Sequence, residues 1–148
     1  MSETISSFLT HDHRACDEEF AVLENTVASE NWAEVEKVFK KFTSDMQHHF
    51  DMEEKVMFPQ FEDKTGMTCG PTQMMRMEHQ QMIQIMGDMK ADVEAKNKDH
   101  FFGLSETLMM LIQQHNMKEE QMLYRMADNH FGADVEAVVN QMKEVERA

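Results

Sequence analysis

The sequence predicts an all-α fold, an up-down-up-down four-helix bundle with a short additional C-terminal helix. Gly and Pro are scarce, at five and two of 148 residues, so few positions interrupt a helix. Apolar residues recur in steps of three and four along four long segments, which is the spacing of one helical face. A chain of this length can bury a core of its own without disulfides.

The four main helices are predicted at about 3–29, 32–63, 71–96 and 99–127. The breaks between them fall at residues 29–31, in the loop before Pro71 and at residues 96–99, and Pro71 suits a first helical turn. Residues 1–128 are predicted to form the bundle. The amphipathic segment 129–148 is predicted to pack on it or at a dimer contact.

Polar residues interrupt the apolar stripes of the first two helices. The first stripe, which begins at Ile5, contains His13. The second contains His49 and Glu53 and continues to Val56. A single histidine on an apolar face is usually a hydrogen-bonded core residue, but a buried carboxylate without a partner is costly.

The third and fourth helices repeat this interruption. His79 lies among methionines in the third stripe, and the fourth contains His115 and Glu119 before continuing to Met122. All four stripes therefore carry a histidine, and two carry a glutamate as well. Something in the core must neutralise these carboxylates.

The four histidines are predicted to share one layer of the bundle. About 16 residues separate His13 from the end of its helix and about 17 separate the next helix start from His49, or roughly 25 Å each. His79 and His115 are likewise separated from the turn between their helices by nearly equal numbers of residues. Side chains on antiparallel helices converge only at equal depth, so these four can meet.

The glutamates are expected to join this layer because residues four apart lie nearly above one another on a helix. This spacing relates His49 to Glu53 and His115 to Glu119. Four neutral imidazoles and two carboxylates suit a pair of borderline divalent ions, which both carboxylates could bridge. Iron is the natural occupant, and a metal-free structural bundle is the alternative.

Four segments of the chain read HDHRACDEEF at 11–20, HFDMEEKVMFPQFE at 49–62, GPTQMMRMEH at 70–79 and HNMKEEQMLYRMAD at 115–128. These segments resemble the hemerythrin-like proteins of the HHE cation-binding family and occur in that family's order over residues 5–128. The resemblance implies a non-haem di-iron centre with six protein ligands. They are His13, His49, Glu53, His79, His115 and Glu119. It also implies that both glutamates bridge the irons together with an oxo or hydroxo group.

The chain departs from the oxygen-carrying hemerythrins at Ile83, where those proteins have a second histidine on the third helix. With two histidines for each iron, both metals should keep open or water-filled positions, and Ile83 should help to limit solvent access to them. We therefore expect reaction with dioxygen, peroxide or nitric oxide in oxidative or nitrosative stress. The alternatives are an iron donor for iron-centre repair and a non-catalytic protein that binds oxygen or nitric oxide.

Other polar residues near the layer receive ordinary assignments. We expect His11 and His48 to point away from it. Glu54 and Glu120 adjoin the proposed bridges and would replace them only if the helical register shifted by one residue. Tyr124 is expected on the bundle surface, with a redox-active phenol as the alternative.

Charge and composition limit the partners and the location. The net charge of −14 excludes nucleic acid and anionic lipid as expected partners. No stretch approaches the roughly 20 apolar residues of a membrane span, and nothing resembles a secretory signal, so we expect a cytoplasmic monomer or homodimer. Cys16 and Cys69 are expected to be free thiols, and the 17 methionines to fill the core.

Overall fold

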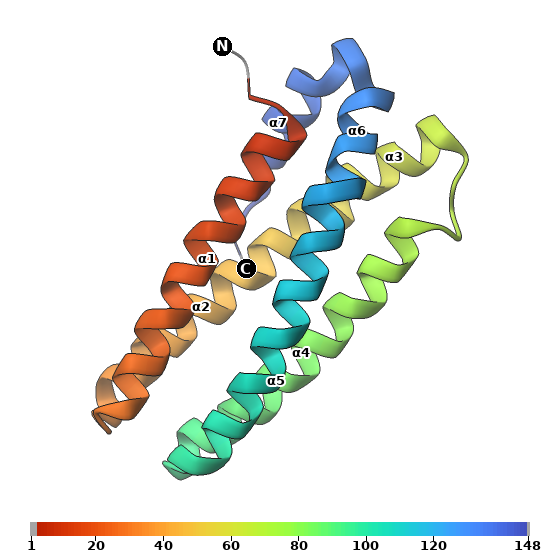
Figure 1. Ribbon diagram of the computed structural model, residues 1–148. Coiled ribbons are helices and arrows are strands. Elements are labelled where there is room, and N and C mark those ends of the chain that lie inside the picture. Colours follow the sequence, from red (N-terminus) through yellow and green to blue (C-terminus); the bar gives the residue numbers. More distant parts are fainter. Residues whose placement is uncertain (1–2, 148) are drawn as a thin grey trace.

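A computed structural model describes residues 3–147 and confirms the all-α bundle (Figure 1). Successive long helices run in opposite directions, as predicted. The helical elements are α1 (Ile5–Ala28), α2 (Trp32–Met52), η1 (Glu53–Met57), α3 (Phe58–Thr65), α4 (Pro71–Ala95), α5 (Lys98–Lys118), η2 (Glu119–Leu123), α6 (Tyr124–Phe131), η3 (Gly132–Asp134) and α7 (Val135–Lys143). Among the described residues, no helix is both long and apolar enough to cross a membrane.

Local capping explains where the helices begin and end. The Thr4 side chain accepts a hydrogen bond from the backbone of Ser7, and the Ser7 hydroxyl accepts one from the backbone of Thr4. Asn31 and Asn97 cap the starts of α2 and α5 with their side-chain oxygens. Gly66 ends α3 at a positive φ of 73°. These caps set the depth at which each helix presents its side chains to the core.

Two of the four long helices contain a single π-helical turn. The turn η1 joins α2 to α3, and η2 joins α5 to α6, so each helix continues past the turn. A π-helical turn holds one residue more than an α-helical turn, so the following helix is rotated by about 100°. Neither turn was predicted.

The rotation changes which residues face the core beyond each turn. An uninterrupted α-helix would bury Val56 and Met122. In the structure Met57 is fully buried and Val56 only partly, while Leu123 is buried and Met122 is 53% exposed. The prediction for Met122 is therefore wrong, because the extra residue in η2 moves the buried face one position along the chain.

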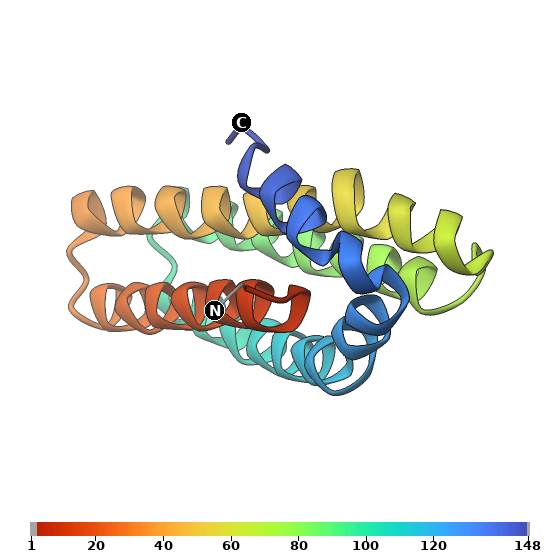
Figure 2. The same ribbon diagram turned by 90° about the horizontal axis from the view of Figure 1, so that it is seen from above.

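Two apolar clusters occupy the two ends of the bundle. One includes Phe20 and Phe42 and extends toward the α1–α2 and α4–α5 turns. The other includes Phe61 and the buried face of α7, which contacts α1 and η1 and lies obliquely across the long helices (Figure 2). The C-terminal helix thus packs on the bundle, and the polar layer lies between the two clusters.

Candidate metal centre

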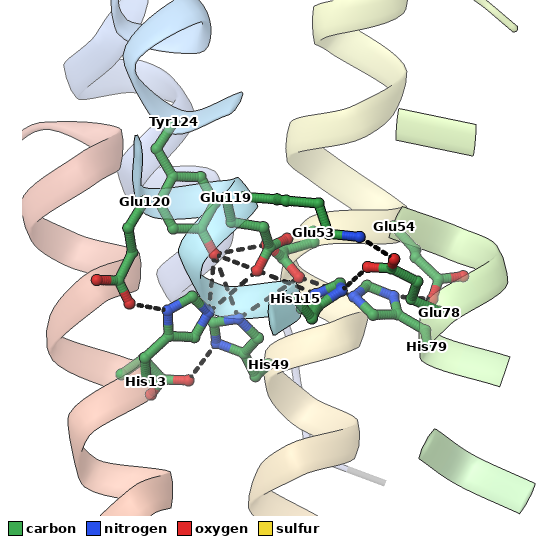
Figure 3. A network of polar contacts seen from close by, with 12 residues as sticks. His13, His49, Glu53, Glu54, Glu78, His79, His115, Glu119, Glu120 and Tyr124 are labelled. Carbon is green, nitrogen blue, oxygen red and sulfur yellow. Dashed lines mark hydrogen bonds and ion pairs between the residues drawn. The ribbon is translucent and has the colours of Figure 1, made fainter. Parts of the chain in front are cut away.

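Six polar side chains converge inside the bundle at one level (Figure 3). They are the residues predicted to interrupt the apolar stripes, and each is at most 4% exposed: His13, His49, Glu53, His79, His115 and Glu119. The ring centroids of His13 and His49 are 4.6 Å apart, and those of His79 and His115 are 4.9 Å apart. The histidines therefore meet in one layer, as the depth argument predicts.

These side chains form two groups that share both glutamates. One group combines His13 and His49 with Glu53 and Glu119, and the other combines the same glutamates with His79 and His115. Within each group the potential ligand atoms all lie within 4.8 Å of one another. Each group could hold one metal ion.

Each glutamate lies between the two groups. Oε1 of Glu53 is 3.4 Å from Nε2 of His49 and 3.1 Å from Nε2 of His79. Oε1 of Glu119 is 3.1 Å from Nε2 of both His13 and His115. One carboxylate oxygen of each glutamate thus faces an imidazole from each group, so both groups can share each carboxylate.

Four further carboxylates hold the outer nitrogens of the imidazoles. The Nδ1 atoms lie 2.6–2.8 Å from a carboxylate oxygen in the pairs His13–Glu120, His49–Asp12, His79–Glu54 and His115–Glu78. An ionised carboxylate can only accept a hydrogen bond, so Nδ1–H donates in every pair. Nε2 is then directed inward, as in metal sites where an outer carboxylate orients the histidine.

The outer carboxylates follow a simple pattern along the chain. Each belongs to the neighbour of an inner residue: Asp12 precedes His13, and Glu78 precedes His79. Glu54 and Glu120 follow the inner glutamates in the same way. From the sequence, Glu54 and Glu120 were expected only as alternatives to the inner glutamates, and no role was predicted for Asp12 and Glu78. An acid next to a predicted core histidine is nevertheless a signal for such a partner.

Tyr124 belongs to the layer, so its expected surface position is wrong. It is fully buried, and its hydroxyl donates to Oε2 of Glu53 at 2.7 Å and lies 2.9 Å from Oε1 of Glu119. The Tyr124 hydroxyl oxygen is also 3.0 Å from Nε2 of His13. The rotation introduced by η2 turns this side chain inward.

The remaining histidines near the layer face away from it. His11 is exposed, and Nε2 of His48 is 2.9 Å from the carbonyl oxygen of Val145. Both observations agree with the sequence analysis. Cys16 and Cys69 are free, with Cys16 buried and Cys69 exposed.

A small cavity adjoins one side of the layer. His13 and His49 contribute to its wall together with Cys16 and Met82, and its open space accommodates about one water-sized molecule. Met82, rather than Ile83, lines this cavity. Ile83 is partly buried and packs against the apolar cluster that contains Phe42.

The surrounding carboxylates favour the charged form of the imidazoles. Burial alone would lower the pKa of His13, but hydrogen bonds to two glutamates raise it to about 10. Burial also opposes the charged form of His79, but the nearby carboxylates of Glu53 and Glu54 raise its pKa to about 9. Burial would lower the pKa of His115, but the negative charge of Glu119 raises it. A bound cation would replace protons at this layer.

The two inner glutamates are not equivalent electrostatically. Burial and the charge of Glu119 raise the pKa of Glu53. Although burial also acts on Glu119, the charge of His115 and several hydrogen bonds hold its pKa well below the usual range. Burial and the two carboxylates raise the pKa of Tyr124, so its phenol stays neutral and can donate.

The donor set fits a metal. Six buried side-chain atoms have no hydrogen-bond partner in the described part of the chain, and four of them belong to one group: Glu53 Oε1, His79 Nε2, His115 Nε2 and Glu119 Oε2. Such atoms are costly when buried without a partner, and a cation would satisfy them together. No thiolate is involved, so the donors are those typical of borderline divalent ions.

Comparison with known proteins points to the same chemistry. The family model described as hemerythrin HHE cation binding domain matches residues 4–127. No curated protein and no solved structure matches the chain. The matched range contains both groups of the layer and the four outer carboxylates.

The raised pKa values predict how the metal-free protein responds to pH. His13 and His79 have pKa values of about 10 and about 9 in the folded chain, against 6.5 when unfolded. Because folding raises these values, their stabilisation is complete below pH 6.5 and is lost as the pH rises toward 9–10. The free energy of unfolding, measured with urea on chelated protein, should fall between pH 6.5 and 8.5.

The exposed His11 provides the control for this pH dependence. His11→Ala should leave the pH slope unchanged, whereas Glu120→Gln should reduce it, because a neutral amide raises the pKa of His13 less than the carboxylate does. A free energy of unfolding that increases from pH 6.5 to 8.5 would contradict the assigned protonation of the layer.

Proposed function

The chain belongs to the hemerythrin HHE cation-binding family, and from this membership we propose that it binds two iron ions and reacts with small oxidants. The proposed ligands are His13, His49, Glu53, His79, His115 and Glu119, with both glutamates bridging. An oxo or hydroxo group would complete the bridge. The substrates we propose are dioxygen, peroxide and nitric oxide.

The orientation of the imidazoles carries this proposal. Every Nδ1–H is bound to an outer carboxylate, so every Nε2 faces the inner glutamates. A layer that served only to fill the core would not need four separately oriented imidazoles. Nitrogen and oxygen donors with two shared carboxylates support a pair of ions of intermediate softness, and iron is the one we propose.

The number of protein donors supports reaction at the metal. Each ion would receive two imidazoles and the two shared carboxylates, which leaves positions for an exogenous ligand. The cavity beside His13 and His49 has room for a molecule about the size of water. When bound, the iron pair would supply the electrons for reducing the oxidant. The protein would orient the ligands, limit water and offer the Tyr124 hydroxyl as a hydrogen-bond donor.

Metal content tests the proposed ligands. Protein reconstituted with iron without air should retain about two ions per chain. Glu119→Ala should lose metal because both groups share this carboxylate. His115→Ala should lose metal from its own group, while His11→Ala and His48→Ala should keep the native content. Elemental analysis after desalting distinguishes these outcomes.

The outer carboxylates provide a graded version of this test. Glu54→Gln or Glu120→Gln should weaken metal binding by about 10- to 100-fold, because each disturbs the hydrogen bond that orients an imidazole. The exposed Glu18→Gln is the matched control. Native protein that retains no metal after reconstitution would refute the proposal, and native occupancy by zinc or manganese would refute the iron assignment.

Rapid mixing tests the proposed reaction. The reduced, iron-loaded protein should be oxidised by dioxygen or peroxide, because open positions at the ions admit a small molecule. Absorption spectra should then show no return to the reduced form when argon is passed through the oxygenated sample. Full recovery of the reduced form under argon would identify reversible oxygen binding instead.

A further inference from the structure

The two halves of the metal centre carry aromatic residues at equivalent positions, and these two residues differ by one hydroxyl. An aromatic residue follows each inner glutamate by five positions: Phe58 follows Glu53, and Tyr124 follows Glu119. The Phe58 ring stacks against His79 with centroids 5.9 Å apart, and the Tyr124 ring stacks against His13 at 5.6 Å. Equivalent rings therefore cover the two groups, but only one carries a hydroxyl.

The Tyr124 hydroxyl lies inside the group that contains His13 and His49. It donates to Oε2 of Glu53 and is 3.0 Å and 3.5 Å from Nε2 of the two histidines (Figure 3). It also lies 2.9 Å from Oε1 of Glu119. The hydroxyl thus contacts all four members of this group, in the space toward which their donor atoms converge.

The group that contains His79 and His115 has no comparable hydroxyl. The Nε2 atoms of both histidines lack hydrogen-bond partners in the described residues, as do Oε1 of Glu53 and Oε2 of Glu119. The 3.1 Å contacts between Nε2 of His79 and Oε1 of Glu53, and between Nε2 of His115 and Oε1 of Glu119, lack hydrogen-bond geometry. A cation entering this group gains ligands without breaking a hydrogen bond to a phenol.

We propose that the centre takes up its ions in order, with the first held by the His79–His115 group and the second admitted to the His13–His49 group only when the Tyr124 hydroxyl gives up its contacts. This inference rests on the proposed two-ion centre. Tyr124 is a positioning residue that makes the halves unequal. The ion between His13 and His49 is consequently the more weakly held and the more readily exchanged.

Calorimetric titration with Fe²⁺ under argon tests the order of binding. Metal-free native protein should bind two ions in two steps whose affinities differ by at least about tenfold, which corresponds to about 1.4 kcal/mol. Tyr124→Phe should strengthen the second step and bring the two affinities together. The matched variant Phe58→Tyr introduces a hydroxyl into the other half and should weaken the first step.

Half-site variants identify which group fills first. His13→Ala should keep one tightly bound ion, whereas His115→Ala should lose the tight step. Circular dichroism and thermal unfolding of each variant establish that it is folded before titration. Two equal affinities in the native protein, an unchanged isotherm for folded Tyr124→Phe, or a tight step that survives His115→Ala but not His13→Ala would overturn the inference. Native protein that binds fewer than two ions would overturn the proposed centre itself.

Discussion

The burial of two carboxylates among four imidazoles is the constraint on which the rest of the structure depends. Glu53 and Glu119 are completely buried between two apolar clusters, where an uncompensated charge would be strongly destabilising. The four imidazoles surround these carboxylates and compensate their charge. The outer carboxylates orient the imidazoles by accepting hydrogen bonds from Nδ1–H. Each helix of the bundle therefore contributes both packing and one part of the charge balance.

The π-helical turns connect this layer to the backbone. Each turn begins at an inner glutamate, η1 at Glu53 and η2 at Glu119. Each rotates the next stretch of helix, which brings Phe58 and Tyr124 over the imidazoles of the neighbouring helices. Such turns occur frequently at functional sites. The same backbone feature thus turns an aromatic ring toward each half of the layer, and only the ring of Tyr124 carries a hydroxyl.

The long helices and the convergence of the layer could be predicted because they depend on periodicity and depth, which are linear properties of the chain. The position of Tyr124 could not be predicted in this way. An α-helical count places Met122 on the buried face, and no residue type marks where an α-helix admits an extra residue. Asp12 and Glu78 were missed for a different reason: their partners lie on other helices, so only the packed structure pairs them with His49 and His115.

The most direct test of the two-ion centre is X-ray absorption spectroscopy at the iron edge of the loaded native protein. The shared glutamates predict a shell of nitrogen and oxygen donors and a second iron within about 4 Å of the first. Iron bound with the expected nitrogen and oxygen donors but without a neighbouring iron in fully loaded protein would contradict the account. It would mean that the two groups of the layer do not act as one centre.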